Sequence, residues 1–435
     1  YIGSGEVILA PRAGAILGLT ILWVPFFGIF LKYWIGLAGA RYTVCTGEGM
    51  VDMLSRTPGP KNWVIYLVFI GQLASGAISS AAIAAAAGAF TSYFIPISST
   101  LLGWIIAAAV FTLTFIGGFN ILKSLMSIMV LLIIIGVLDV TIETWPGLAT
   151  LANGIFGFHV PAVPDWAFPD MEVKPSPWAE ILPLLGWAAG GFASQVWYTY
   201  WVIGAGYGMT AGRGYGKPLD PEQLKAVDEE NANSLKGWCR VVSADATMGM
   251  LIGILVTLAF AIAGAGVLGP AQVAPEGNNV AFTLSRIFGE KWGEIGAHLY
   301  VLAGLAALIS TMLGQFAGWP RLLADCGRIL FPGFGKIPWL KQFRLVLILF
   351  TFSNMVIVYG YGVKPVLLVQ LGAVLDGLLL TPLQAVAVGV VLYLVMPKFF
   401  SKEAWKIIKP SPVYAVMLSL AFLVFSYFCL FKLWE

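Results

Sequence analysis

The chain has 435 residues, of which 59% are hydrophobic and 11% are charged, and its formal net charge is +3. Soluble domains carry about 25% charged residues, so this composition excludes an ordinary soluble protein. Apolar stretches of about 20 residues recur with no long polar block between them, which predicts a single integral domain in contact with the lipid bilayer. The sequence contains no basic patch interleaved with aromatic residues, so we expect no nucleic-acid partner.

The first apolar segment contains two glycines, a carboxylate and a proline within its first eleven residues. Non-helical backbone at membrane depth is tolerated only where it packs in protein or lines a water-filled cavity. We therefore predict a helix break and a substrate site at Gly3, Ser4, Gly5 and Glu6. Because the chain starts on Tyr1, we also expect a half-helix to precede it.

Hydropathy predicts eleven membrane segments, with proline, glycine and charged residues in the gaps. All eleven are expected to be helices. They cover residues 1–16, 19–42, 62–92, 99–120, 124–145, 180–206, 240–268, 294–320, 343–362, 365–396 and 411–433.

The basic residues indicate an orientation. If the N-terminus is cytoplasmic, eighteen of the 25 Lys and Arg residues fall in cytoplasmic gaps and five fall on the opposite side. The positive-inside rule therefore predicts a cytoplasmic N-terminus in a bacterial-type inner or plasma membrane. The gap at 207–240 then lies in the cytoplasm, and Asp220-Pro221 indicates the start of a short helix within it.

Cysteine spacing and the absence of catalytic motifs limit the chemistry further. Cys45, Cys239, Cys326 and Cys429 show no paired spacing, so we expect neither a disulfide framework nor a zinc site. No catalytic constellation or ATP-binding domain is recognisable. We predict no enzymatic activity and no cofactor.

Several short motifs resemble the NRAMP family of proton-coupled divalent metal transporters. Gly5, Ala13-Gly14-Ala15, Leu22-Trp23-Val24 and Thr46-Gly47 match in order and spacing the family's DPGN, AGA, LWV and ATG motifs. Residues 314–318 resemble the family's eighth span, and 367–382 its tenth. The resemblance implies an all-α LeuT-type fold of the APC superfamily, with inverted five-helix repeats at 1–145 and 180–396 and an extra helix at 411–433. It also implies that the first helix of each repeat is unwound at the midplane.

The second break is then expected within Gly190 to Tyr198, where the family has an MPHN motif. In the family, the aspartate and asparagine of DPGN and the methionine of MPHN bind the metal. In this chain Gly3 replaces the aspartate and Glu6 replaces the asparagine. No Met or His lies between Gly186 and Gly206. Thioethers favour transition metals, so their absence predicts a hard cation such as Mg²⁺ over iron or manganese. The family's proton-handling Asp and His are also replaced, which predicts alternating access without proton coupling.

Oxygen donors remain at both breaks. Mg²⁺ prefers carboxylate and carbonyl oxygens and keeps several waters, so Glu6 and Gln195 are the candidate metal ligands. A divalent cation bound there would be substrate. The surrounding substrate-binding candidates at the second break are Ala193, Ser194, Trp197 and Tyr198.

Three charged residues fall inside predicted spans: Arg12, Lys32 and Asp376. Such charges cost at least about 2.5 kcal/mol each on insertion scales, so they usually face a cavity or a partner. Asp376 can supply a second carboxylate to a hard-cation site, and Lys32 can act as a fixed replacement for a coupling cation. The alternative is that these charges, including Arg12, are paired within the scaffold.

A second resemblance leaves the substrate class open. Ile2-Gly3-Ser4-Gly5 followed by Pro11 is similar to the Gly-Ser-Gly break of amino-acid and polyamine transporters with the same fold, in which helix-end amides hold a substrate carboxylate. Aromatic residues at 197–201 can form a wall for an organic cation. A carrier of an amino acid or other small organic solute is therefore the alternative, and a non-transporting membrane scaffold or receptor is a third possibility. Oligomeric state is not predicted.

Overall fold

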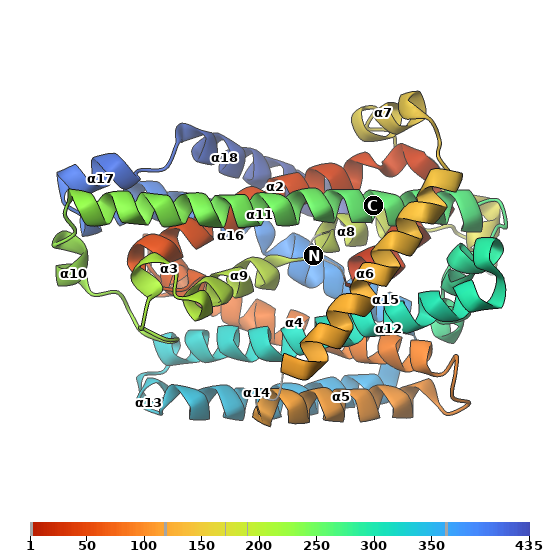
Figure 1. Cartoon of the computed structure of the whole chain (residues 1–435), viewed down its shortest axis with the longest axis horizontal. Coiled ribbons are helices and arrows are strands. Elements are labelled where there is room, and N and C mark those ends of the chain that lie inside the picture. Colours follow the sequence, from red (N-terminus) through yellow and green to blue (C-terminus); the bar gives the residue numbers. More distant parts are fainter. Residues whose placement is uncertain (1–2, 117–119, 170, 189, 362–363) are drawn as a thin grey trace.

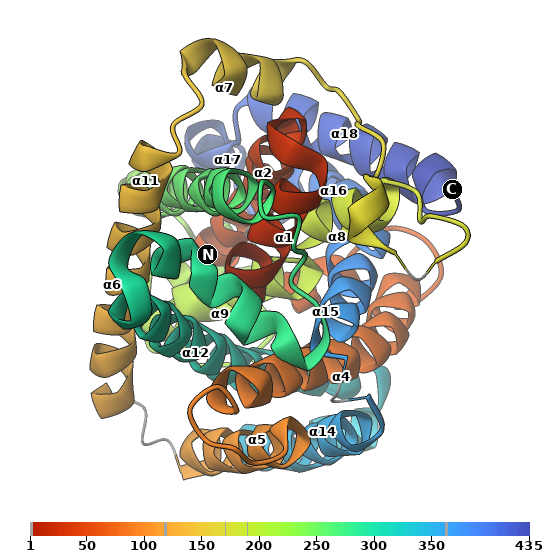
Figure 2. The same cartoon turned by 90° about the vertical axis from the view of Figure 1, so that its right-hand side faces the viewer.

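The computed structural model describes residues 3–116, 120–169, 171–188, 190–361 and 364–435. Over these residues the chain is a bundle of helices without strands, which confirms the predicted all-α class. Most helices run along the long axis, with α3, α10, α13 and α17 at one end, called the α3 end below, and α7 toward the other end (Figure 1). The view in Figure 2 shows α1 in the middle of the bundle and α5 beside α14 at one edge.

The first part of the chain forms one short broken helix, several long helices and two short connecting helices. A π-helical turn, η1, precedes α1, and α7 bends away from α6 by 112°. The elements are η1 (Gly5–Leu9), α1 (Ala10–Leu17), α2 (Trp23–Thr46), α3 (Met50–Ser55), α4 (Trp63–Thr91), α5 (Ser99–Ile116), α6 (Asn120–Glu143) and α7 (Leu148–Phe156).

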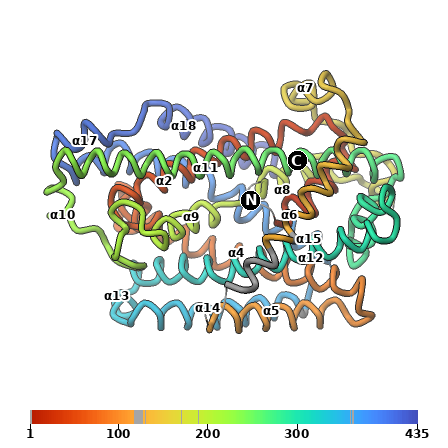
Figure 3. The backbone as a smooth tube through the Cα atoms, viewed as in Figure 1, coloured from red at the N-terminus to blue at the C-terminus, as the bar shows by residue number. Residues whose placement is uncertain are grey.

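The second part begins with a broken pair of helices and contains the longest helices of the bundle. In Figure 3, α11 and α12 run along most of its length. The elements are α8 (Trp178–Trp187), α9 (Phe192–Ala205), α10 (Pro221–Lys225), α11 (Glu229–Ala263), α12 (Val280–Leu330), α13 (Pro332–Gly335), α14 (Trp339–Tyr361), α15 (Pro365–Val374), η7 (Leu375–Leu379), α16 (Thr381–Val390), α17 (Lys402–Ile408) and α18 (Pro412–Tyr427).

Each predicted membrane segment coincides with helical structure. Among the described residues, eight helices are long and apolar enough to cross a membrane, and the α6–α7 pair is a ninth if it counts as one bent span. The other predicted segments are α1, which is short, and the broken pair α8–α9. The division into two inverted repeats at 1–145 and 180–396 stays a prediction.

One predicted span begins earlier in the structure, and another begins where predicted. Helix α11 starts at Glu229 rather than 240, because the Asp228 side chain accepts a hydrogen bond from the Asn231 amide and caps a polar first turn. Helix α12 spans Val280–Leu330 but is interrupted at Gly293, which has a φ of 63° and a ψ of −153°, so its second part starts at the predicted residue 294. Hydropathy detects only the apolar part of a helix, so it does not detect a polar extension at the start of the helix.

Helix α4 forms the centre of the packing. Its run from Ala81 to Ala89 is buried among α12, α5 and α15. Gly88 allows α4 to approach the start of α5 closely, since a Cβ at Gly88 would lie 2.1 Å from the Ser99 carbonyl oxygen. Small residues at such contacts let helix backbones meet in a membrane protein, where lipid is as apolar as leucine.

The first predicted break differs in form from the expectation. Ile2 lies outside the described residues, Ser4 already has helical backbone angles, and Gly5–Leu9 form a wide π-helical turn. The described part of the break is therefore a widened helical turn. We expected an unwound segment from Gly3 to Glu6, and this expectation is wrong for Ser4, Gly5 and Glu6, which are helical. Glu6 provides a physical reason, because its carboxylate accepts a hydrogen bond from the Gly3 amide at 2.8 Å and holds the first turn together.

The second break is non-helical, but it lies earlier than the centre of the predicted range. Helix α8 ends at Trp187, Gly190 has a φ of 80°, and α9 begins at Phe192. Residues 192–198 are therefore helical. The glycines account for this position, because a positive φ is readily adopted only by glycine.

Candidate functional site

A central cavity of about 420 Å³ lies where the two breaks meet. It is bounded by the start of η1, the α8–α9 break, the middle of α12 and η7. Its lining residues are Gly3, Ser4, Gly5, Glu6, Trp187, Gly190, Ser194, Gln195, Trp197, Tyr198, Trp201, Ser310, Thr311, Gly314, Gln315, Trp319 and Asp376. The structure therefore brings together most of the sequence candidates, and leaves Ala193, Arg12 and Lys32 behind the cavity wall.

Glu6 is buried on η1, with 2% of its surface exposed. Its Oε2 accepts from the Gly3 amide at 2.8 Å, and its Oε1 accepts from the Thr257 hydroxyl of α11 at 3.4 Å. The carboxylate thus sits at the start of the first helix, where the helix dipole favours negative charge. It also occupies the Gly3 amide, which an anionic substrate would otherwise use.

Asp376 provides a second buried carboxylate, on η7. Its Oδ1 accepts from the Gln72 side chain and from the Ala193 amide, each at 3.1 Å. Gln72 in turn accepts a hydrogen bond from the Trp319 indole at 2.6 Å. Ala193 therefore acts through its backbone amide at the start of α9. The π-helical turn that carries Asp376 is a distortion often found at functional sites.

Lys32 lies behind the cavity on α2, with 1% exposure. Its Nζ donates to the carbonyl oxygens of Leu185, Gly186 and Gly190 at 3.0, 2.9 and 2.8 Å. Glu6 and Asp376 both interact electrostatically with it. Lys32 thus joins α2 to the α8–α9 break and interacts with both carboxylates of the cavity.

Arg12 belongs to a separate buried ion pair. Its guanidinium donates to both carboxylate oxygens of Glu180, with the NH2 group at 2.8 Å, and to the Pro275 carbonyl. Gln370 adds a bond to Glu180 at 3.1 Å. The structure places Arg12 in the scaffold between α1 and α8, and the sequence did not reveal Glu180 as its partner.

Helix α12 supplies polar lining residues that the sequence reading did not select individually. Ser310, Thr311 and Gln315 face the cavity. Gln315 is 4% exposed, and no described residue hydrogen-bonds its Oε1. The resemblance of 314–318 to the family's eighth span was the signal that could have identified this wall.

The aromatic wall combines α9 with α12. The rings of Trp197 and Trp319 meet edge to face with centroids 4.9 Å apart, and the Tyr198 hydroxyl donates to Asp245 at 2.7 Å. The Gln195 side chain turns toward α2, since a Cβ at Gly36 would lie 2.1 Å from its Oε1. Aromatic side chains therefore form much of the α9 side of the cavity.

Donor chemistry at the cavity is dominated by oxygen. Among the described ranges, no three His, Cys, Asp or Glu side chains gather as a metal-binding group. Glu6 and Asp376 provide carboxylates, and Ser4, Gln315 and their neighbours provide neutral oxygen atoms. Of the four cysteines, Cys45 and Cys239 contact each other through Sγ atoms 3.6 Å apart, away from the cavity lining.

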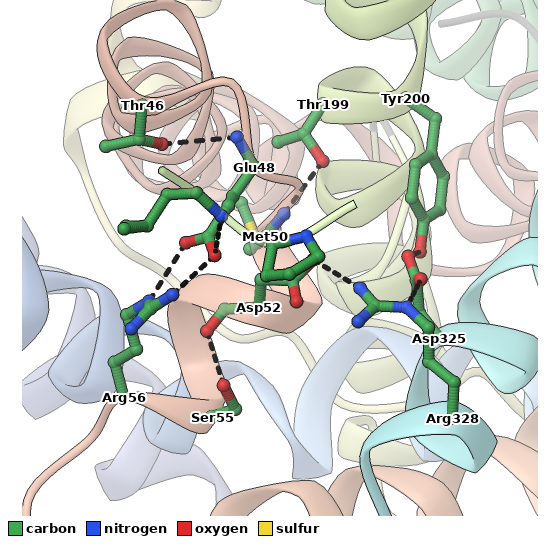
Figure 4. Close-up of polar contacts among 12 residues, drawn as sticks. Thr46, Glu48, Met50, Asp52, Ser55, Arg56, Thr199, Tyr200, Asp325 and Arg328 are labelled. Carbon is green, nitrogen blue, oxygen red and sulfur yellow. Dashed lines mark hydrogen bonds and ion pairs between the residues drawn. The ribbon is translucent and has the colours of Figure 1, made fainter. Parts of the chain in front are cut away.

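A second polar region lies at the α3 end, and Figure 4 shows it. Arg56 pairs with Glu48 at 2.5 Å, and Glu48 also accepts from the Tyr42 hydroxyl and the Leu219 amide. Arg328 of α12 pairs with Asp52 at 2.6 Å and with Asp325 at 2.7 Å, and the Tyr200 hydroxyl donates to Asp325 at 2.6 Å. The α3 cluster is defined here as Glu48, Asp52, Arg56, Tyr200, Asp325 and Arg328.

The α3 cluster connects α3 to both α9 and α12. The Met50 amide also donates to the Thr199 hydroxyl of α9 at 3.0 Å. Burial raises the pKa of Asp52 to about 7, while the Arg328 guanidinium opposes that rise. From the sequence, Arg56 and Arg328 were counted only among the basic residues of cytoplasmic gaps, and their carboxylate partners were not selected.

Comparison with known proteins gives a consistent result for the fold. No curated protein sequence matches the chain. The Eremococcus coleocola manganese transporter, in one of its solved mutant forms, superposes with a TM-score of 0.62 at 15% identity, over 98% of this chain and 83% of that one. Mhp1 in an inward-facing conformation superposes with a TM-score of 0.52 at 12% identity, over 98% of this chain and 86% of Mhp1. MhsT in complex with L-phenylalanine superposes with a TM-score of 0.51 at 12% identity, over 97% of this chain and 95% of MhsT.

The family comparison covers the first part of the chain. Residues 1–167 match the Nramp family model, described as natural resistance-associated macrophage protein-like. Together with the apolar helices, these likenesses identify an integral membrane protein with a transporter fold. Residues 1–167 are therefore similar to the Nramp family, and the described helices as a whole share the fold of the manganese transporter, Mhp1 and MhsT.

Proposed function

We propose that the chain is a secondary transporter that carries a hard divalent cation, such as Mg²⁺, through the central cavity. The observation that carries this proposal is the presence of two buried carboxylates, Glu6 and Asp376, at distorted helix turns on the wall of one cavity. The Nramp match and the likeness to a manganese transporter support a divalent ion as substrate.

The donor set favours Mg²⁺ over softer ions. The described lining residues supply carboxylate, amide and hydroxyl oxygens and include no methionine, cysteine or histidine. Mg²⁺ dehydrates reluctantly and is held through one or two carboxylates and retained waters. A cavity of about 420 Å³ has room for such a partly hydrated ion, since a water molecule takes about 30 Å³ of liquid volume.

The transport cycle proposed here is alternating access without proton coupling. Within the part of the chain that the structure describes, the cavity lining has no histidine to relay a proton. The orientation proposed from the basic residues places the α3 end in the cytoplasm of a bacterial-type inner or plasma membrane. In that orientation the ion pairs of the α3 cluster join α3 to α12 at the cytoplasmic end.

The test is uptake into proteoliposomes that contain a Mg²⁺-sensitive dye. We expect the wild type to take up Mg²⁺ faster than protein-free liposomes, and faster than it takes up Mn²⁺. Glu6→Gln and Asp376→Asn preserve side-chain shape but remove a charge, so each should slow Mg²⁺ uptake about tenfold or more. Glu290→Gln is the matched control, because Glu290 is exposed and its ion pair with Arg286 lies at the surface.

The uptake experiment also separates the alternatives. Equal Mg²⁺ uptake by the wild type and both cavity variants would contradict the proposed site. A preference for Mn²⁺ would contradict the proposed ion. Absence of all cation and solute uptake in a folded protein would favour the scaffold or receptor.

A carrier of an organic cation or amino acid is the second candidate, and the aromatic wall of Trp197, Tyr198 and Trp201 favours it. Aromatic faces attract ammonium groups. However, Glu6 occupies the Gly3 amide, so the break offers a poor site for a substrate carboxylate. Uptake of an amino-acid mixture or a polyamine, with no Mg²⁺ uptake, would support this candidate.

A further inference from the structure

The Lys32 side chain has an unusual set of partners for a buried base. Its Nζ donates three hydrogen bonds to main-chain carbonyl oxygens, those of Leu185, Gly186 and Gly190. A lysine ammonium has three donors, whereas a neutral amine has only two. Three bonds of 2.8–3.0 Å match the three donors of the ammonium form.

These carbonyls are grouped by the end of α8. Helix α8 stops at Trp187, so its last carbonyls have no partner within the helix, and they lie at the negative end of the helix dipole. Gly190 adds a third carbonyl because its positive φ turns the chain back toward the helix end. Converging carbonyl oxygens of this kind replace the hydration shell of monovalent metal ions, and helix ends at broken spans bind such ions in transporters.

Glu6 and Asp376 are of opposite charge to a lysine ammonium, and both interact with Lys32 electrostatically. We propose that the carbonyls of Leu185, Gly186 and Gly190 form a monovalent-cation site that the chain fills permanently with the Lys32 ammonium. The chain carries its own cation at this site, so the break is stable without dissociable Na⁺ or K⁺. Transport then needs no such ion, a consequence that rests on the proposed function.

Two substitutions at Lys32 test the site through protein stability alone. Lys32→Ala removes the ammonium and leaves space at the carbonyls, whereas Lys32→Met removes the charge but fills the space. The melting temperature of each purified protein is measured in N-methylglucamine, Na⁺, K⁺ and ammonium chlorides at equal ionic strength. Lys61→Ala, at an exposed position, is the control.

We expect Lys32→Ala to melt below the wild type in N-methylglucamine, and one or more of the small cations to raise its melting temperature by about 2 °C or more. The wild type, Lys32→Met and Lys61→Ala should show no such selective rise. If Lys32→Ala is as stable as the wild type in N-methylglucamine, or responds to the cations no more than Lys32→Met does, the proposed site is wrong.

A transport measurement then tests the consequence. Wild-type Mg²⁺ uptake should be equal in Na⁺, K⁺ and N-methylglucamine, whereas Lys32→Ala should require the cation that stabilises it. Wild-type uptake that depends on Na⁺ or K⁺ would overturn the inference. Absence of Mg²⁺ uptake in every buffer, combined with a cation-dependent melting temperature for Lys32→Ala, would reject the proposed function and leave the cation site standing.

Discussion

The central cavity and the α3 cluster both bury carboxylates, but they satisfy them in different ways. In the α3 cluster, Arg328 forms ion pairs with Asp52 and Asp325, and Arg56 forms one with Glu48. The hydrogen bonds described above for the cavity carboxylates come from neutral amide and hydroxyl groups, while Lys32 directs its three donors to carbonyl oxygens.

This difference separates holding the fold from binding a ligand. Guanidinium–carboxylate pairs neutralise one another and fix the helices that carry them. Carboxylates held by neutral donors keep their negative charge available to a cation. We therefore expect substitutions in the α3 cluster to affect stability first, and substitutions of cavity side chains to affect transport first.

The largest effect on stability is expected for Arg328→Ala. The substitution leaves Asp52 and Asp325 buried without their shared base, which costs about 3–5 kcal/mol when one partner of a buried pair is removed. Denaturation in detergent at pH 8 measures the loss. Arg286→Ala is the control, because its pair with Glu290 is exposed and contributes about 1 kcal/mol or less. Similar losses for the two variants would show that the α3 cluster does not hold the fold.

The next effect is a pH dependence caused by Asp52. Burial raises its pKa to about 7, near Arg328, Asp325 and Glu48, so the folded state binds a proton more tightly than the unfolded state does. This contribution to stability is complete below about pH 4 and is lost as the pH rises through about 7. The unfolding free energy should therefore fall by an amount on the order of 3 kcal/mol over that interval.

Asp52→Asn checks the assignment, because an amide cannot titrate but keeps an oxygen for Arg328. The decline between pH 4 and pH 8 should be smaller in Asp52→Asn than in the wild type. The comparison is made by denaturation at each pH in the same detergent. Parallel pH profiles for the two proteins would assign the dependence to other groups.

A smaller loss is expected where α8 packs against η7 beside the cavity. A Cβ at Gly377 would lie 1.9 Å from the Gly186 carbonyl oxygen, so Gly377→Ala must push the two elements apart. Overpacking of this kind costs about 1–3 kcal/mol. The shift would also move Asp376, so Mg²⁺ uptake should fall together with the melting temperature. Gly360→Ala is the control, because no described atom lies within 4 Å of its added Cβ.

The sequence predicted the helices and the cavity better than it predicted the ion pairs. Hydropathy located the spans because long apolar stretches are a local property of the chain. Gly190 and Gly191 mark the second break directly, whereas Gly3 and Gly5 led to an expected unwound segment where the structure has a π-helical turn. Glu180 was missed because its partner, Arg12, lies 168 residues away in the sequence. Asp325 was missed because Tyr200, which donates a hydrogen bond to it, lies on a different helix. A local pattern cannot show which distant charge will face a residue.

The smallest expected change in stability is also the sharpest test of the difference between the two regions. No described residue hydrogen-bonds the buried Oε1 of Gln315. Replacing an unsatisfied polar group by an apolar one of similar shape is nearly neutral or stabilising, so Gln315→Met should change the unfolding free energy by less than about 1 kcal/mol. Its Mg²⁺ uptake should nevertheless fall, because the cavity loses an oxygen that can bind the ion or its water. A marked loss of stability with unchanged uptake would mean that this side of the cavity serves the fold, as the α3 cluster does.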